Sequence, residues 1–89
     1  MKLTITKAAR LYGYIIWNNV TNPDMEKLLK NRSNVDVVFN DLPIGNKPVN
    51  WKYRRLSIGY RFTRALPETA KFFSLSYKNG TLEVKTLEQ

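Results

Sequence analysis

The most regular pattern of apolar and polar positions lies near the end of the chain, in residues 72–86. Residues 72–78 and 81–86 both alternate apolar with polar side chains, which is the two-residue period of a strand. Asn79-Gly80 between them is the preferred sequence for a two-residue type I′ turn, because both central residues need positive φ. The pattern predicts a β-hairpin with its apolar residues on one face, in the pairs Tyr77–Leu82, Leu75–Val84 and Phe73–Thr86.

Three earlier stretches show the same two-residue period. Residues 2–6 and 35–40 alternate apolar with polar side chains over a short length. In residues 51–64, a strand would turn its even-numbered positions toward the core, namely Leu56, Ile58, Tyr60 and Phe62. The odd-numbered positions would face outward, namely Tyr53, Arg55, Ser57, Gly59, Arg61 and Thr63.

Residues 7–17 fit two different structures. The run from Tyr14 to Trp17 is β-branched or aromatic, and Gly13 weakens a helix by about 1 kcal/mol relative to alanine. Apolar residues at helical spacing favour a helix instead, namely Ala8, Leu11, Tyr12, Ile15 and Ile16. We predict a strand over residues 11–17, preceded by a turn or the start of a helix over residues 7–10.

Residues 22–26 carry the signals of a helix start. Asn22 can cap the helix, Pro23 suits the first helical position, and two acids lie where the helix dipole favours negative charge. The sequence therefore predicts one short helix over about residues 22–32, with an apolar stripe made of Met25, Leu28 and Leu29.

The remaining central stretch, residues 41–50, contains two prolines and one glycine and is predicted to be a loop. The fold class that follows is α+β. We expect a small antiparallel sheet of about five strands, with the 22–32 helix packed on one face and the hairpin turning at Asn79-Gly80. With 89 residues and no internal repeat, the chain is expected to form a single basic domain over residues 1–89.

Composition removes several kinds of chemistry. The chain has no cysteine and no histidine, so the usual zinc, copper and haem ligands and the commonest general base near neutral pH are missing. The seven carboxylates are scattered, and their spacing indicates no catalytic pair. We therefore expect no catalytic residues, no metal, no cofactor and no enzymatic activity.

The sequence shows no segment typical of membranes or export. The longest apolar run, residues 14–17, is far below the roughly 20 residues that a membrane span needs. The first residues also lack the long apolar core of a signal peptide. We expect a cytoplasmic protein without a membrane partner.

Charge is the property that points to a partner. The net charge is +8, and the lysines and arginines between Asp41 and Glu68 lie in a window without any acidic residue. Arginine makes bidentate contacts with phosphate, and aromatic rings stack on unpaired bases. We predict a nucleic-acid-binding module that favours single strands or RNA, with the contact residues Trp51, Lys52, Tyr53, Arg54, Arg55, Gly59, Arg61 and Arg64.

Two alternatives remain open at this point. Rings and arginines are also enriched at protein interfaces, so the chain could be a protein-interaction or assembly module, including a homo-oligomer formed through an open sheet edge. Residues 6–13, with the pair Ala8-Ala9, look like the first helix and turn of a helix-turn-helix, which would favour duplex DNA. That motif requires a second amphipathic helix directly after the turn.

Overall fold

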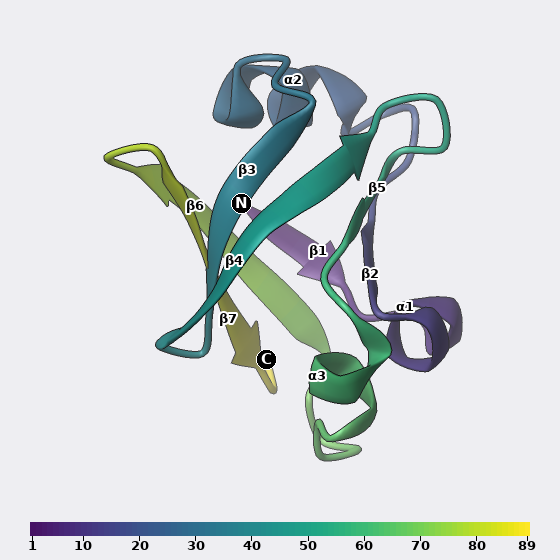
Figure 1. Cartoon of the computed structure of the whole chain (residues 1–89). Helices are drawn as coiled ribbons and strands as arrows, with labels where there is room; N and C mark the ends of the chain where they lie inside the picture. The colour runs from purple at the N-terminus through teal and green to yellow at the C-terminus, as the bar shows by residue number, and fades with distance from the viewer.

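The computed structural model describes the whole chain, residues 1–89, with seven strands and three short helices (Figure 1). The elements are, in chain order, β1 (Lys2–Thr4), α1 (Lys7–Tyr12), β2 (Tyr14–Ile16), α2 (Asn22–Leu29), β3 (Asn34–Phe39), β4 (Leu42–Asn50), β5 (Arg55–Ser57), α3 (Tyr60–Arg64), β6 (Phe72–Lys78) and β7 (Thr81–Leu87). The predicted α+β class is confirmed. No helix has the length and apolar character that crossing a bilayer requires.

The seven strands form one mixed sheet in the order β1-β6-β7-β3-β4-β5-β2. Every neighbouring pair is antiparallel except β3 and β7, which run parallel. The sheet curls until it is nearly a barrel, with β1 and β2 as its two edges (Figure 1). The prediction of an antiparallel sheet of about five strands with one helix was therefore wrong in detail, because it missed β4, α1, α3 and the parallel pair.

The hairpin of β6 and β7 has the predicted register. Tyr77 pairs with Leu82, Leu75 with Val84 and Phe73 with Thr86. Asn79 and Gly80 have φ of 54° and 81°, as a type I′ turn requires. The turn residues and the apolar pattern agree here, so the sequence alone was sufficient to predict the hairpin and its register.

The predicted loop at residues 41–50 is instead the nine-residue strand β4. A second tight turn at Asn40-Asp41, both at positive φ, joins it to β3. Pro43 lies where the register shifts at a bulge between Val37 and Val38, and bulges tolerate proline. The Val49 N–H points toward β3 and donates to the Ser33 carbonyl at 2.9 Å, so the nitrogen of the preceding Pro48 points toward β5. The pairing of β4 with β5 covers only Val49 and Asn50, so Pro48 lies just beyond the end of that ladder. Its missing N–H therefore removes no ladder hydrogen bond.

Residues 7–17 contain both of the structures that the sequence left open. The helix α1 begins after Thr6, whose hydroxyl accepts a hydrogen bond from the Ala9 N–H at 3.0 Å, and ends at Gly13 in the left-handed region. The strand prediction over residues 11–17 was correct only for β2. Because β2 follows α1 directly, the second helix of a helix-turn-helix is absent.

The basic stretch 51–64 is not one strand. It forms a turn at residues 51–54, the short strand β5 and the helix α3. Leu56 and Ile58 are buried as predicted. Thr63, expected to face outward, is fully buried and its hydroxyl donates to the Arg10 carbonyl at 2.7 Å. The alternation fails after Gly59, whose φ of 104° ends the extended backbone and starts α3.

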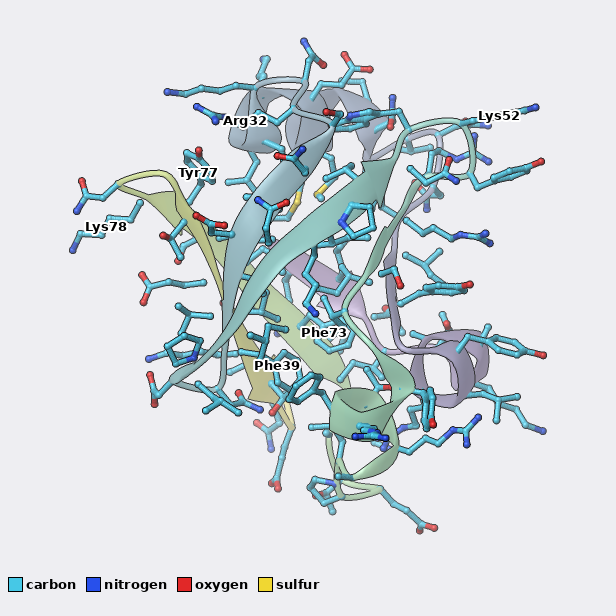
Figure 2. The ribbon with its side chains drawn as sticks, in the orientation of Figure 1. Arg32, Phe39, Lys52, Phe73, Tyr77 and Lys78 are labelled. Carbon is cyan, nitrogen blue, oxygen red and sulfur yellow. The ribbon has the colours of Figure 1, made fainter.

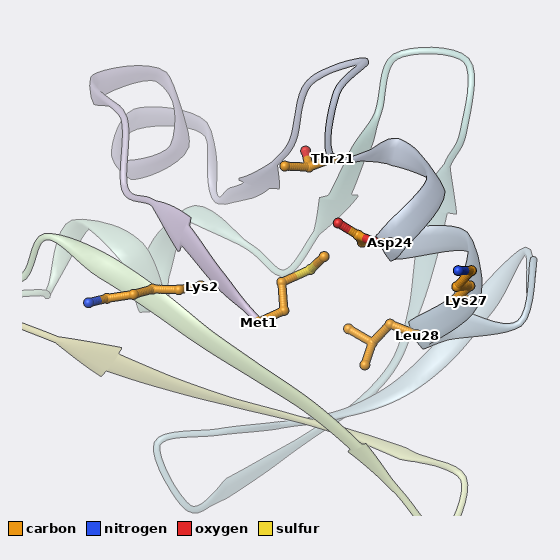
Figure 3. A pocket seen from close by; sticks show the side chains of 6 residues that line it. All are labelled: Met1, Lys2, Thr21, Asp24, Lys27 and Leu28. Atoms are coloured by element: carbon orange, nitrogen blue, oxygen red, sulfur yellow. The ribbon is translucent and has the colours of Figure 1, made fainter.

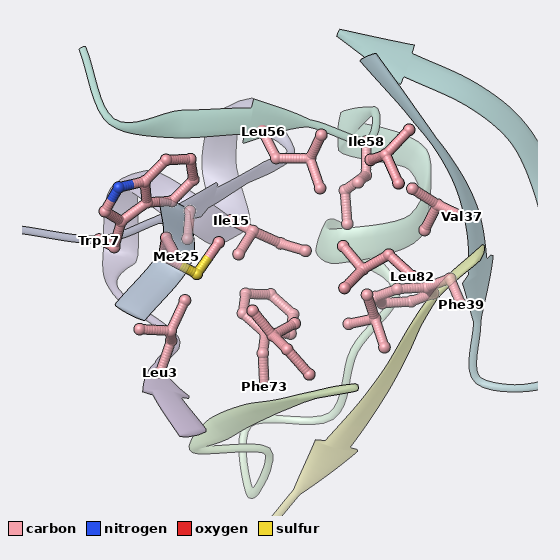
Figure 4. Close-up of a cluster of buried hydrophobic side chains, with 14 of the residues drawn as sticks. Leu3, Ile15, Trp17, Met25, Val37, Phe39, Leu56, Ile58, Phe73 and Leu82 are labelled. Atoms are coloured by element: carbon pink, nitrogen blue, oxygen red, sulfur yellow. The ribbon is translucent and has the colours of Figure 1, made fainter. Parts of the chain in front are cut away.

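The helix α2 closes one end of the barrel (Figure 1). It ends at Leu29, earlier than predicted, because Lys30 and Asn31 both have positive φ. Asn22 does not cap it: the Asn22 Oδ1 accepts a hydrogen bond from Trp17 Nε1 at 2.8 Å. Met25 and Leu29 are fully buried in a core of 18 apolar residues, together with side chains such as Ile15, Leu56, Phe73 and Leu82 (Figure 4).

Candidate functional site

The strands β2, β5 and β4 lie side by side and present an outward face to solvent. Ile15, Leu56 and Val49 are paired across these strands and buried in the core. The residues that alternate with them, such as Tyr14, Arg55 and Ser57, therefore point toward the other face of the sheet. The register pairs Tyr14 with Ser57 and Asn50 with Arg55, whereas Ile16 is partly buried and packs against the core.

Arg55 is the centre of this face. Its guanidinium carbon lies 4.5 Å from the centre of the Tyr14 ring and 5.2 Å from the centre of the Tyr53 ring. Lys52 lies over the same Tyr53 ring at 5.5 Å and projects away from the sheet (Figure 2). Each such contact stabilises the cation by about 0.5–1 kcal/mol at an exposed site. Two tyrosines therefore hold the guanidinium in place.

No carboxylate neutralises these cations. The structure contains one ion pair, between Lys85 and Asp41 at 3.9 Å. The Arg55 side chain makes no hydrogen bond within the chain, although a guanidinium has five N–H donors. Its donors are therefore free of partners within the chain.

The aromatic face continues over the two small helices. The rings of Tyr12 and Tyr14 are 6.1 Å apart, and Arg64 lies 4.5 Å from the centre of the Tyr60 ring. Arg64 Nε also donates to the Leu11 carbonyl at 2.9 Å, which joins α3 to α1. We call this region the tyrosine–arginine surface; it consists of Tyr12, Tyr14, Lys52, Tyr53, Arg55, Tyr60 and Arg64.

A small hollow opens next to Arg55. It has a volume of about 170 Å³ and is lined by Tyr14, Pro48, Asn50, Arg55 and Ser57. Ser57 lies in the middle strand, so the smallest of these side chains stands between the Tyr14 and Pro48 rings. The Asn50 Oδ1 accepts a hydrogen bond from the Tyr53 N–H at 2.9 Å. That bond fixes the orientation of the amide and closes the turn that carries Tyr53.

The structure brings some of the predicted contact residues together and separates others. Lys52, Tyr53 and Arg55 adjoin one another, and Arg64 reaches the same surface from α3. Arg61 is exposed on α3, whereas Gly59 is the N-cap residue of that helix and has positive φ.

Trp51 and Arg54 lie differently from the prediction. The Trp51 ring packs edge-on against Trp17 at 5.6 Å, and its Nε1 donates to the Arg32 carbonyl at 2.8 Å. Trp51 therefore completes the core. Arg54 has a left-handed backbone with φ of 53°, and its Nε is buried without a hydrogen-bond partner. Its backbone carbonyl holds the Trp17 N–H at 3.0 Å.

Sequence reasoning missed six residues of this region, namely Tyr12, Tyr14, Pro48, Asn50, Ser57 and Tyr60. Tyr12 and Tyr14 lie in the segment whose structure was ambiguous, and Pro48 and Asn50 lie in the segment predicted as a loop. Tyr60 was expected to face the core but is 49% exposed. The one signal that could have found Asn50 and Pro48 is the Asn40-Asp41 turn, which predicts a strand after it.

Another hollow, larger and more open, lies between β1 and α2 (Figure 3). It measures about 570 Å³, contains no aromatic ring, and is lined by Met1, Lys2, Thr21, Asp24, Lys27 and Leu28. The carboxylates of the chain form no group of three that could hold a metal ion. Cations also lie over the half-buried ring of Tyr77, where Lys30 and Arg32 are each 5.9 Å from the ring centre. The exposed tyrosine rings, Tyr12, Tyr53 and Tyr60, all belong to the tyrosine–arginine surface.

Comparisons with protein-family models, with curated proteins and with solved structures found no match for this chain.

Proposed function

We propose that the protein binds single-stranded nucleic acid through the tyrosine–arginine surface. The observation that carries this proposal is Arg55, a guanidinium held between two tyrosine rings with no carboxylate partner. A guanidinium in this setting suits a phosphate, to which it can donate two parallel hydrogen bonds. The exposed rings beside it suit bases, because stacking on an aromatic side chain contributes about 1–3 kcal/mol per base.

Exposure of the rings supports the same partner. Tyr12, Tyr53 and Tyr60 are 57%, 56% and 49% exposed, although large aromatic side chains usually bury most of their area. The net charge of +8 adds a long-range attraction to any polyanion. Rings and cations that alternate along a surface are the arrangement that proteins use for unpaired bases and their backbone.

The helices argue against a duplex partner. α1 has six residues and α3 has five, so neither is a recognition helix of the kind that enters a major groove. The rings instead stand on a sheet face and on the ends of these short helices. Bases must be unstacked to meet such rings, which favours single strands.

Removal of two positive charges from the tyrosine–arginine surface should weaken the binding of a single strand. We expect Lys52→Gln with Arg55→Gln to reduce the affinity for a labelled single-stranded oligonucleotide about tenfold. The same change should lower the slope of log K against log salt by about 1.4, since each phosphate contact on a single strand contributes about 0.7. Fluorescence anisotropy at about 50 and about 200 mM salt measures both values.

The matched control removes two charges elsewhere. Tyr77 and Lys78 lie on the side of the molecule away from Lys52 (Figure 2), and the Lys30 Nζ lies 5.9 Å from the centre of the Tyr77 ring. Lys30→Gln with Lys78→Gln should reduce affinity less than about threefold, because salt screens charges that lie more than about 10 Å from the nucleic acid. Equal losses in the two double variants would show that net charge alone drives binding, and would contradict the proposed surface. Thermal unfolding checks that both variants remain folded.

The open sheet edges supply a second candidate function, self-association. β1 and β2 each leave one side unpaired, and a second copy could pair with either. Both edges are only three residues long, and β1 carries Lys2. Short, charged edges resist pairing, so nucleic-acid binding is the better-supported function. Light scattering of the free protein separates the two candidates, because a concentration-dependent dimer would favour association.

A further inference from the structure

The hollow beside Arg55 has the chemistry of a selective base pocket. We infer, on the basis of the proposed function, that it receives one unpaired base and prefers bases whose reading edge carries carbonyl oxygens. Uracil and thymine carry a carbonyl oxygen at position 4 and guanine carries one at position 6, where cytosine and adenine carry an exocyclic amine. The inference depends on which hydrogen-bonding groups the chain has already used.

Asn50 offers mainly its donors to a ligand. Its Oδ1 already accepts a hydrogen bond from the Tyr53 N–H at 2.9 Å, and the amide orientation is set by that bond. The Nδ2 group carries two N–H donors, and neither has a partner within the chain. Asn50 therefore meets a ligand in the hollow through its donating end.

The other polar side chains of the hollow extend the same bias. Arg55 has only donors and makes no hydrogen bond within the chain. The hydroxyls of Ser57 and Tyr14 can donate or accept, and the Asn50 Oδ1 keeps a second lone pair. No acid lines the hollow. A base amine would therefore meet more donors than acceptors.

The walls of the hollow suit a flat ring. Tyr14 and Pro48 stand on the two strands that flank Ser57, and both present rings. Arg55 lies over Tyr14 and covers one end. Arginine commonly recognises guanine through a bidentate contact with O6 and N7, and carbonyl oxygens of uracil and thymine accept the same donors. The pocket thus combines ring contacts with donors aimed at carbonyl groups.

Uridine and cytidine oligonucleotides provide the sharpest test. The two bases have nearly the same size. They differ at position 4, which carries a carbonyl oxygen in uracil and an amine in cytosine, and at N3, which donates in uracil and accepts in cytosine. We expect rU12 to bind about tenfold more tightly than rC12 at one salt concentration, because a good hydrogen-bonding pair discriminates between bases by about that order. A strand of this length lies within the roughly 4–16 nucleotides that comparable single-strand modules cover.

The substitution Asn50→Asp tests the contribution of the Asn50 Nδ2 donor. Aspartate can still accept from the Tyr53 N–H, so the turn is retained, but the donating end becomes an acceptor. We expect the preference for rU12 over rC12 to fall to about twofold or to reverse, while both affinities decrease because of the added negative charge. The control Asn79→Asp adds the same charge at the distant hairpin turn, where Asp-Gly is also favoured. It should keep the tenfold preference.

The outcomes separate this inference from the proposed function. Equal affinity for rU12 and rC12, a preference for rC12, or an unchanged ratio in Asn50→Asp would overturn the base pocket and leave nucleic-acid binding in place. Failure of the wild-type chain to bind either oligonucleotide at low salt would overturn both.

Discussion

Gly13 is the residue on which the candidate surface depends most closely. Its φ is 75°, and a Cβ atom there would lie 2.2 Å from both the Gly59 carbonyl carbon and the Tyr60 nitrogen. Its carbonyl accepts hydrogen bonds from Ile58 at 2.8 Å and Gly59 at 3.1 Å. The backbone between α1 and β2 therefore touches the start of α3 at this point. Only glycine permits that approach, which brings Tyr14 and Tyr60 onto one surface.

Gly13→Ala should be strongly destabilising for this reason. A left-handed backbone costs alanine about 1–2 kcal/mol, and the overlap with the backbone adds about 1–3 kcal/mol. We expect a total loss of about 3 kcal/mol in the free energy of unfolding, measured by urea denaturation.

Gly45→Ala is the matched control for the backbone term. Gly45 also has positive φ, at 88°, but nothing lies within 4 Å of the position that a Cβ would occupy. Gly45→Ala should lower the free energy of unfolding by only about 1–2 kcal/mol. If the two substitutions cost the same, the close contact at Gly13 contributes nothing.

At the scale of elements, Arg10 shows that not every cation is available to a ligand. Its guanidinium donates to the carbonyls of Leu66, Pro67 and Ala70, at 3.1, 2.9 and 2.6 Å. These three carbonyls belong to the irregular segment between α3 and β6. Arg10 therefore ties that segment to α1, and its side chain is directed toward the protein.

Arg10→Lys tests this structural role without a change of charge. Lysine lacks the planar fork that reaches three carbonyls at once, and hydrogen bonds to charged groups contribute about 1.5–3 kcal/mol. We expect a loss of about 2 kcal/mol in stability, together with faster amide hydrogen exchange in residues 66–70. Arg61→Lys, at an exposed position on α3, should change stability by less than about 0.5 kcal/mol. Similar effects of the two substitutions would refute the proposed role of Arg10.

The elements also show what the sequence could predict. The β6–β7 hairpin was predictable because its turn residues and its apolar pattern are local and agree. β4 was missed because Pro43 and Pro48 suggest a break, whereas a bulge and the end of a ladder accommodate them. The helix α3 was missed because Tyr60 and Phe62 continue the alternation of a strand, and only the tertiary contact at Gly13 shows where that strand stops.

The candidate site was predictable to a similar extent. Lys52, Tyr53 and Arg55 are close in sequence, and the acid-free window marked them. Tyr14 and Asn50 reach Arg55 through pairing between strands that are distant in sequence. No pattern within a single segment contains that information. Trp51 was assigned to the surface because an aromatic ring next to lysine and arginine resembles a residue that stacks on nucleobases, but its ring packs on Trp17.

At the scale of the whole molecule, charge is distributed without internal compensation. The chain has 15 lysines and arginines and seven acids, yet one ion pair is present. Exposed charges of one sign repel each other and are neutralised by a polyanion, whose binding releases counterions. The exposed rings give this general attraction a location, because they belong to α1, β2, α3 and the turn before β5. Figure 1 shows β2, β5 and α1 on one side of the barrel.

The most direct test is to map where a single strand contacts the protein. In ¹⁵N-labelled protein titrated with rU12, we expect the largest NMR shift changes at the amides of Tyr14, Asn50, Tyr53, Arg55 and Ser57, and at the Arg55 side chain. The amides around Tyr77 and the β6–β7 turn should change little. Saturable binding with its shift changes centred on that hairpin end, or no shift change at low salt, would contradict the account.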